Sequence, residues 1–371
     1  MDRKEILGSK KRIVIKVGTT TITYDETGNI NLDKLEKFVR ILINLRNKGR
    51  EVIVVSSGAV GIGRNVLGLA GKPETEAAKQ ACAAVGQGRL MMIYEKLFNE
   101  YSQLTAQVLL TKESITNEEC RKNARQTFDE LFRMNVVPIV NENDAISVDE
   151  LSYGNFGDND TLAAYVAKLV DADLLILMSD IEGLYTDDPK KNPNARFIHT
   201  VVGIDDKLEQ MAKGASSDMG TGGMSTKIDA AKIATASGAD MVIANGANIY
   251  SINDIMAGKK IGTLFLSREH GMALENELAP ERAMYRRQAK KQKKEGQKEE
   301  GYKDEGDKEK IQKADDCSRF QRRAAAACVH PSETDIGEQQ AGTMKQDSAE
   351  FSMIMTGGSY GQLYGNIGQQ G

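Results

Sequence analysis

The sequence predicts an α/β fold of three layers, in which an open and mainly parallel sheet lies between two layers of helices. Short apolar runs of strand length alternate with longer stretches of helical periodicity over residues 10–266, which is typical of β-α-β units. Several of these runs end directly in glycine, serine, threonine or aspartate, as strands do at the ligand-binding edge of a parallel sheet.

The first half of the chain carries clear strand and helix signals. The run 13–15 predicts a strand, and Asn31 is a typical N-cap for a helix whose apolar positions repeat until Gly49. The run 52–55 predicts the next strand. The alternation continues with a helix at about 74–100, a strand at 105–110, a helix after Asn117 and a strand at 136–140.

The second half repeats the pattern and then loses it. We expect a helix from Thr161, a strand at 174–178, a helix from Thr226, a strand at 241–244, a short helix near 251–257 and a strand at 263–266. Residues 1–267 are therefore predicted to form one folded domain. Residues 268–371 contain a charged run at 286–313 and a polar, glycine-rich end, so we expect a low-complexity, disordered tail.

Composition narrows the class of protein. The 371 residues are 27% charged and 40% hydrophobic, with a net charge of −4. No apolar run reaches the roughly 20 residues of a membrane span, and the acidic balance argues against a general nucleic-acid binder. The charged N-terminus lacks the apolar core of a signal peptide, which predicts a cytoplasmic protein. The cysteines are far apart and predict neither a zinc site nor disulfides.

A glycine-rich run from Gly220 to Lys227 is the most informative local feature. Three glycines, flanking hydroxyls and a lysine open a predicted helix, and exposed backbone N–H groups at such a start favour phosphate. The lysine follows the threonine, so the run differs from the Walker A pattern. Taken alone, such a turn is more often structural.

Two strand ends support the phosphate interpretation. The first predicted strand continues into Lys16, which is followed by glycine and three threonines, and the run 52–55 continues into Ser56-Ser57-Gly58. A lysine at a strand end beside glycine is typical of a ligand site more than of a solvated surface position. We expect these strand ends to meet at one edge of the sheet.

Six motifs, in a single order, resemble the amino acid kinase family, and most closely its members that phosphorylate free glutamate. They cover residues 10–266, although Asn155 stands where some members carry lysine. The motifs are Lys16–Thr19, Ser56–Ala59, Asn141–Asp144, Phe156–Asp160, Ser179-Asp180 with Gly183–Tyr185, and Thr221–Lys227. The resemblance implies phosphorylation of the γ-carboxylate of L-glutamate by ATP and Mg²⁺, the first step of proline biosynthesis.

The resemblance also implies roles for individual residues. Lys16 and Lys227 would flank the phosphoryl group in transit, with Asp160 holding both lysines, and Asp158 would carry Mg²⁺ through water. The amino acid would be bound by Ser57, Gly58, Ala59, Asp144 and Asn159. The region of about 172–267 would bind ATP, together with Lys16, through Ser179, Asp180, Thr221, Gly222, Gly223, Met224, Ser225, Thr226 and Lys227.

Simple chemistry agrees with part of this assignment. Asp144 can accept hydrogen bonds from an α-ammonium group, and Ser57 with the Gly58-Ala59 backbone can donate to a carboxylate. The turn Asp158-Asn159-Asp160 also has a structural interpretation as an N-cap cluster for the next helix, in which Asp160 could cap while orienting the lysines.

The family further implies a homo-oligomer, either dimer or tetramer, proline as a feedback inhibitor, and transfer of the product to a glutamyl-phosphate reductase. Longer members carry a β-rich C-terminal domain of the kind found in RNA-modifying enzymes, but residues 268–371 show no strand pattern for it.

Two alternative functions remain: a related kinase acting on N-acetylglutamate, aspartate or UMP, and a non-catalytic metabolite sensor. A dinucleotide oxidoreductase is excluded because the first strand lacks the G-x-G-x-x-G pattern.

Overall fold

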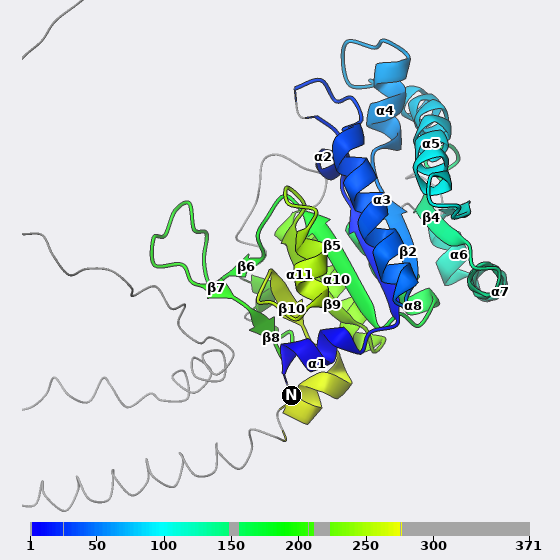
Figure 1. Cartoon of the computed structure of the whole chain (residues 1–371). Helices are drawn as coiled ribbons and strands as arrows, with labels where there is room; N and C mark the ends of the chain where they lie inside the picture. Colours follow the sequence, from blue (N-terminus) through cyan, green and yellow to red (C-terminus); the bar gives the residue numbers. More distant parts are fainter. Residues whose placement is uncertain are drawn as a thin grey trace, which may run out of the picture. The chain divides into compact units, whose positions relative to one another are not determined.

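The computed structural model has the predicted three-layer α/β architecture (Figure 1). The structure describes residues 2–24, 26–147, 156–206, 208–210, 223–274 and 276. The strands are β1 (Arg12–Val17), β2 (Glu51–Ser56), β3 (Thr105–Leu110), β4 (Val137–Glu142), β5 (Leu174–Ser179), β6 (Leu184–Tyr185), β7 (Phe197–Ile198), β8 (Thr200–Val201), β9 (Asp240–Asn245) and β10 (Thr263–Phe265).

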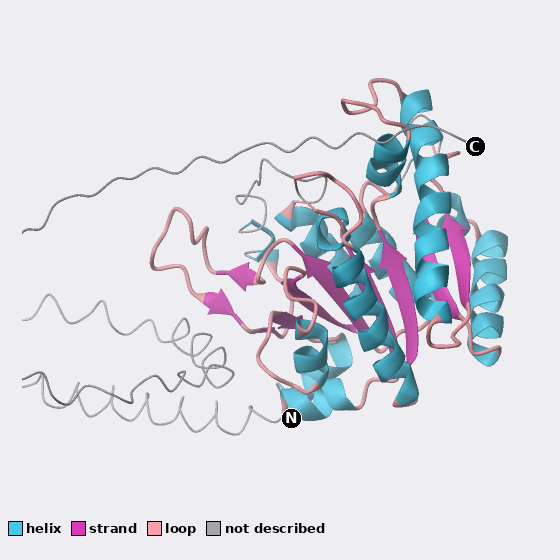
Figure 2. Ribbon diagram, turned by 45° about the horizontal axis from the view of Figure 1, so that its top comes forward, coloured by secondary structure: helices cyan, strands magenta, loops and turns pink. Residues whose placement is uncertain are grey.

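Helices cover both faces of the sheet, as Figure 2 shows with the helices in cyan around the magenta strands. They are α1 (Arg3–Gly8), α2 (Thr19–Ile22), α3 (Leu32–Asn47), α4 (Ala59–Val66), α5 (Glu76–Asn99), α6 (Lys112–Thr116), α7 (Glu118–Arg133), α8 (Asn159–Leu169), α10 (Met224–Ala236) and α11 (Ser251–Met256). Among the helices of the described residues, none is long and apolar enough to cross a bilayer.

The main sheet has eight strands in the order β3-β4-β2-β1-β5-β9-β10-β8. The first six strands in this order run parallel. β10 is antiparallel to β9, and β8 is parallel to β10. The sheet is therefore mainly parallel, as predicted, and the two strands at one edge run in the opposite direction. β6 and β7 form a separate antiparallel pair.

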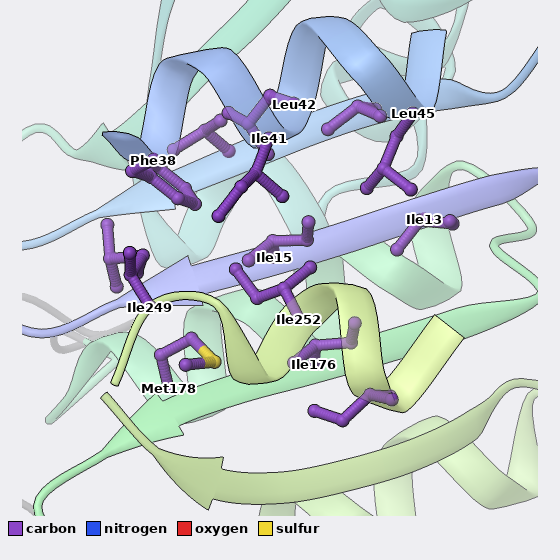
Figure 3. Packing of buried hydrophobic residues seen from close by; sticks show 14 of the residues in the cluster. Ile13, Ile15, Phe38, Ile41, Leu42, Leu45, Ile176, Met178, Ile249 and Ile252 are labelled. Carbon is purple, nitrogen blue, oxygen red and sulfur yellow. The ribbon is translucent and has the colours of Figure 1, made fainter. Parts of the chain in front are cut away.

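The core is divided between the two faces of the sheet. One cluster joins α1, α3, α5 and α11 to one face, and a second cluster joins α7, α8 and α10 to the other. Alternate residues of β1 explain the division, because Ile13 and Ile15 belong to the first cluster and Val14 to the second. Figure 3 shows Phe38 and Ile41 of α3 in the first cluster with the isoleucines of β1.

The expected elements are present, with small shifts at their ends. Asn31 caps α3 by accepting a hydrogen bond from the backbone N–H of Lys34, and Asn117 caps α7 in the same way. The helix expected from Thr161 begins two residues earlier, at Asn159, and the one expected from Thr226 begins at Met224. Asp158 alone is the N-cap of α8, so the idea that Asp160 caps this helix is wrong.

The chain remains ordered beyond residue 267. Residues 268–274 are helical, and the imidazole Nδ1 of His270 lies 2.8 Å from Oδ2 of the buried Asp240 at the start of β9. Lys10 Nζ lies 2.6 Å from the same oxygen. These contacts attach the described part of the 268–371 segment to the core. The tail expected to be disordered lies, from residue 277 onward, outside the described residues.

Candidate active site

The polar strand ends of the sequence lie along one edge of the sheet. In the parallel registers, Val17 at the end of β1 pairs with Ser56 of β2 and with Met178 of β5, and Ser179 pairs with Asn245 of β9. The carboxyl ends of four neighbouring strands therefore stand side by side. This is the edge at which open parallel sheets bind ligands.

Lys16, Asp160 and Lys227 form one buried group of charges at this edge. Nζ of Lys16 lies 2.7 Å from Oδ1 of Asp160, and Nζ of Lys227 lies 3.1 Å from Oδ2 of the same carboxylate. The Asp160 side chain is 2% exposed and that of Lys227 is 6% exposed. The three residues come from β1, α8 and α10, so the fold brings together groups that are far apart in sequence.

The electrostatics of this group keep Asp160 ionised. Burial acts to raise the pKa of Asp160, but the two ammonium groups of Lys16 and Lys227 outweigh it and hold the pKa below its ordinary value. The three ionised side chains carry a net charge of +1. An anion placed beside them would meet two cations whose positions are set by one carboxylate.

A second polar group lies at the adjacent residue, Asn159. Its Nδ2 donates to Oγ of Ser57 over 2.7 Å and to Oδ1 of Asn141 over 3.0 Å. Nδ2 of Asn141 in turn donates to Oε1 of Gln87 over 3.0 Å. The first turn of α8 thus joins both groups, because Asn159 holds Ser57 and Asp160 holds the two lysines.

The start of α4 is built next to Ser57. Gly58 is the N-cap of α4 and has φ of +107°, a conformation that favours glycine. α4 packs closely on α5, because a Cβ added at Gly86 would lie 1.8 Å from the carbonyl oxygen of Ala59. A Cβ at Gly63 would lie 1.8 Å from the carbonyl oxygen of Cys82. Glycines in both helices therefore set the position of the Gly58-Ala59 backbone.

Two carboxylates follow β4. Glu142 is buried, and its Oε1 accepts hydrogen bonds from Oγ of Ser147 and from the backbone N–H of Phe156, each over 3.1 Å. It therefore holds both ends of the segment 148–155, whose residues lie outside the described ones. Asp144 is partly buried, and its burial, together with the charges of Glu142 and Glu76, raises its pKa to about 6.

The predicted nucleotide residues are described in part. Ser179 ends β5, and its Oγ donates to Oδ1 of Asp180 over 2.9 Å. Gly223 is the N-cap of α10, and Oγ1 of Thr226 donates to its carbonyl oxygen over 2.8 Å. Met224 and Ser225 form the first turn of this helix. Thr221 and Gly222 lie outside the described residues.

The described residues offer few ligands for a magnesium ion. Within the described ranges, no group of three or more His, Cys, Asp or Glu side chains could hold a metal. Oδ1 of Asp158 accepts from the backbone N–H of Thr161 over 2.7 Å as the cap of α8. This donor set fits an ion that keeps several waters and binds mainly to nucleotide phosphates, with one carboxylate nearby.

Sequence reasoning missed three polar residues of the site. Asn141 and Glu142 belong to a motif noted in the sequence, but neither received a role. Gln87 was missed because it lies in a helix, 54 residues from Asn141. One signal was available: Gln87 is the polar member of a buried α5 stripe that also contains Ala83, Leu90, Tyr94 and Phe98.

Comparison with known proteins gives consistent matches. Residues 11–245 match the model of the amino acid kinase family. The chain is 50% identical to a protein named glutamate 5-kinase from Clostridium perfringens (strain 13 / Type A), over 267 residues that cover 72% of this chain and 99% of that protein. It is 53% identical to the glutamate 5-kinase of Clostridium tetani (strain Massachusetts / E88), covering 71% of this chain and 97% of that protein.

Some relatives are longer. The glutamate 5-kinase of Carboxydothermus hydrogenoformans is 51% identical over 266 residues, which cover 72% of this chain and 70% of that protein. Among solved structures, the carbamate kinase from Giardia lamblia bound to AMP-PNP matches with 15% identity and a TM-score of 0.49, over 70% of this chain and 99% of that one.

Proposed function

The chain belongs to the amino acid kinase family, and we propose that it transfers the γ-phosphoryl group of ATP to the γ-carboxylate of L-glutamate, forming γ-glutamyl phosphate and ADP. The proposed substrate is the one named in relatives that are about half identical over nearly their whole length. The product is the first intermediate of proline biosynthesis.

The ion pairs of Asp160 with Lys16 and Lys227 carry the proposal of phosphoryl transfer. An oxygen of the glutamate γ-carboxylate attacks the γ-phosphorus, and the bond from that phosphorus to the bridging oxygen of ADP breaks. The attacking carboxylate is already ionised, so the reaction needs no general base. All participants are anionic, and catalysis consists of positioning and charge neutralisation. Two ammonium groups held on one carboxylate supply both.

We assign the acceptor side to the group around Asn159. Ser57 and the Gly58-Ala59 backbone at the start of α4 donate to a substrate carboxylate, while Asp144 and the amide oxygen of Asn159 accept from the α-ammonium group. The hydrogen bond between Asn159 and Ser57 supports a single acceptor site, because it joins two of these groups directly.

ATP is assigned to the part of the site formed by residues 172–267 with Lys16. Ser179 and Asp180 lie at the end of β5, and Gly223 to Lys227 open α10, where the backbone N–H groups of the first turn favour phosphate. Asp158 is the carboxylate that would carry Mg²⁺ through water. The ion, when bound, neutralises charge on the β- and γ-phosphates.

The substrate can be tested directly. The purified protein is incubated with MgATP, hydroxylamine and one acceptor at a time, and acyl phosphate is trapped as hydroxamate. We expect glutamate to give hydroxamate, and N-acetylglutamate and aspartate to give little. UMP, the fourth candidate acceptor, is tested by measuring ATP consumption in its presence. Turnover of N-acetylglutamate equal to that of glutamate would contradict the proposed substrate, and a protein without any turnover would support a sensor.

Further properties of the relatives are proposed for this chain. We expect a cytoplasmic homo-oligomer, dimer or tetramer, that proline inhibits and whose reactive product passes to a glutamyl-phosphate reductase. Residues 1–267 are proposed as the kinase unit. The length of two relatives supports a unit of about this size, because 267 and 264 aligned residues cover 99% and 97% of those proteins.

A further inference from the structure

We propose that Gln87 is a positioning residue that sets the direction of the hydrogen bonds in the acceptor site and thereby the preference for an α-amino group. The inference rests on the proposed function. Gln87 lies in α5, on the side of the helix that faces the sheet, and is 7% exposed. Its neighbours along the buried stripe are apolar or aromatic, so a primary amide at this position needs a polar partner.

The hydrogen bonds that link the side-chain amides of Asn159, Asn141 and Gln87 all run in one direction. Oε1 of Gln87 accepts from Nδ2 of Asn141, so the other end of the Asn141 amide, Oδ1, is presented to Asn159. Asn141 is 2% exposed, and turning its amide would lose both bonds, because its oxygen would then face Oε1 of Gln87 and its nitrogen would face Nδ2 of Asn159. Oδ1 of Asn141 accepts from Nδ2 of Asn159, which places the two N–H groups of Asn159 toward Asn141 and Ser57.

This direction decides what the site offers to a ligand. Both hydrogens on Nδ2 of Asn159 are used inside the protein, so its oxygen is the group that remains for a substrate, and it can accept from an ammonium group. Oγ of Ser57 already accepts from Asn159, so its own hydrogen is free to donate to a carboxylate. If these hydrogen bonds ran in the opposite direction, Asn159 would present an N–H group to the ligand. The hydroxyl hydrogen of Ser57 would then be donated to Asn159 and would not be available to a substrate carboxylate.

α5 supports the site at a second point. The hydroxyl of Tyr94, two turns after Gln87, lies 2.9 Å from Oγ of Ser56, and both side chains are buried. The helix is therefore fixed against the end of β2, next to Ser57. Gln87 reaches Asn141 from a rigid element, as a positioning role requires.

Three variants separate the polar role of Gln87 from its packing. Gln87→Met has the same length but no accepting oxygen, whereas Gln87→Glu keeps an oxygen at that position. Leu90→Met is the control, because it alters the packing of the same stripe without touching the amides. The readout is kcat/KM for glutamate divided by kcat/KM for glutarate, which lacks the ammonium group.

We expect Gln87→Met to raise the KM for glutamate about tenfold with little change in kcat or in the KM for ATP, and to lower the glutamate-to-glutarate ratio about tenfold. The corresponding free energy, near 1.4 kcal/mol, is that of one hydrogen bond. Gln87→Glu and Leu90→Met should keep the wild-type ratio within about twofold. An unchanged ratio in Gln87→Met, or an equal loss in Gln87→Glu, would overturn the proposal.

A second measurement does not depend on the substrate. In the ligand-free protein, the side-chain amide hydrogens of Asn159, assigned by their loss in Asn159→Asp, should exchange slowly with water. We expect slow exchange to persist in Leu90→Met and to disappear in Gln87→Met. Rapid exchange in the wild type would refute the network even if glutamate is the substrate. Absence of glutamate turnover would refute only the proposed function and leave the exchange result standing.

Discussion

Asp160 holds both lysines of the site on a single carboxylate. Its two oxygens each hold one lysine, so Lys16 and Lys227 are kept on either side of a single planar group. Their ammonium groups would otherwise repel each other in a buried place. With the carboxylate between them, the two ammonium groups are held at the same small region. This arrangement suits a reaction whose transition state carries negative charge on several oxygens.

Removal of either lysine should therefore affect the rate more than binding. We expect Lys16→Ala and Lys227→Ala each to lower kcat about 10²–10³-fold, with a much smaller change in the KM for glutamate, because each cation mainly stabilises charge that develops during transfer. Lys232→Ala is the matched control, since Lys232 lies in the same helix as Lys227 and pairs with Glu209. A variant of Lys16 or Lys227 with full kcat would show that its assigned role is wrong.

Asp144 should give the reaction a dependence on pH. Burial and two neighbouring carboxylates raise its pKa to about 6 in the free protein, and only its ionised form attracts an ammonium group. As the pH falls below 6, protonation removes this attraction, so kcat/KM for glutamate should fall about tenfold per pH unit. Bound ammonium favours ionised Asp144, so kcat should fall at lower pH than kcat/KM.

The control for this effect is Asp144→Asn, assayed between pH 5 and 8. Its kcat/KM should be low throughout and nearly independent of pH, because the titrating group is gone. Asp160 does not add a second limb in this range, since its pKa is held below the ordinary value. An unchanged acid limb in Asp144→Asn would assign the titration to another group.

At the scale of elements, the contact between α4 and α5 controls the acceptor site. The two helices approach so closely at Gly63 and Gly86 that a methyl group at either position would overlap backbone atoms of the other helix. The backbone cannot move aside as a flexible side chain can. Any added atom must therefore shift α4 as a whole, and with it the Gly58-Ala59 segment.

Gly86→Ala tests this contact. The new Cβ would meet the carbonyl oxygen of Ala59 at 1.8 Å. We expect a loss of stability of about 1–3 kcal/mol and a raised KM for glutamate, with a smaller effect on the KM for ATP. Gly88→Ala is the matched control, because a Cβ there has no atom within 4 Å and alanine favours a helix. Gly88→Ala should therefore raise the melting temperature slightly and leave the KM for glutamate unchanged, whereas Gly86→Ala should lower the melting temperature and raise that KM.

The sequence predicted long elements better than short ones. α3, α5 and α7 have caps or sustained apolar periodicity, and these signals are local. α2 has four residues, and α4 contains two glycines, so neither carries a pattern that a sequence can display. The direction of β10 depends on which strand lies beside it, which the sequence of β10 itself does not contain.

The sequence indicated some residues of the site and not others. Lys16, Asp160 and Lys227 stand beside glycines and strand ends, and the structure brings them into contact. Gln87 contacts Asn141 only because α5 packs on the sheet next to β4 and β2. A helix in the middle of the chain gives no local sign of such a contact. The residues that support a site are harder to predict than those that face the ligand.

At the scale of the whole molecule, contacts with the core continue beyond residue 267. Asp240 is buried at the start of β9 and contacts Lys10 and His270, and the backbone N–H of Ser267 donates to it over 2.6 Å. Leu274 packs against the first core cluster. The segment up to Leu274 therefore contributes contacts to the domain, although the sequence pattern placed the boundary at 267.

Two truncations test this boundary. A chain that ends after residue 276 keeps His270 and Leu274, and the composition of the removed part predicts no core, so we expect the melting temperature and glutamate turnover of the full chain. A chain that ends after Ser267 leaves Asp240 without His270, and we expect it to melt several degrees lower. Loss of activity in the longer truncation would show that residues 277–371 are needed.

The position of β1 in the sheet has a consequence for synthesis of the protein. β1 is made first, yet one of its two neighbours is β5, and Ile13 pairs with Leu174. A ribosome adds roughly 5–20 residues per second, so one side of this apolar strand waits on the order of 10–30 s for its partner. During that time the nascent chain presents an open strand edge, which is prone to aggregation. Newly made chains should therefore depend on chaperones more than their completed stability would suggest.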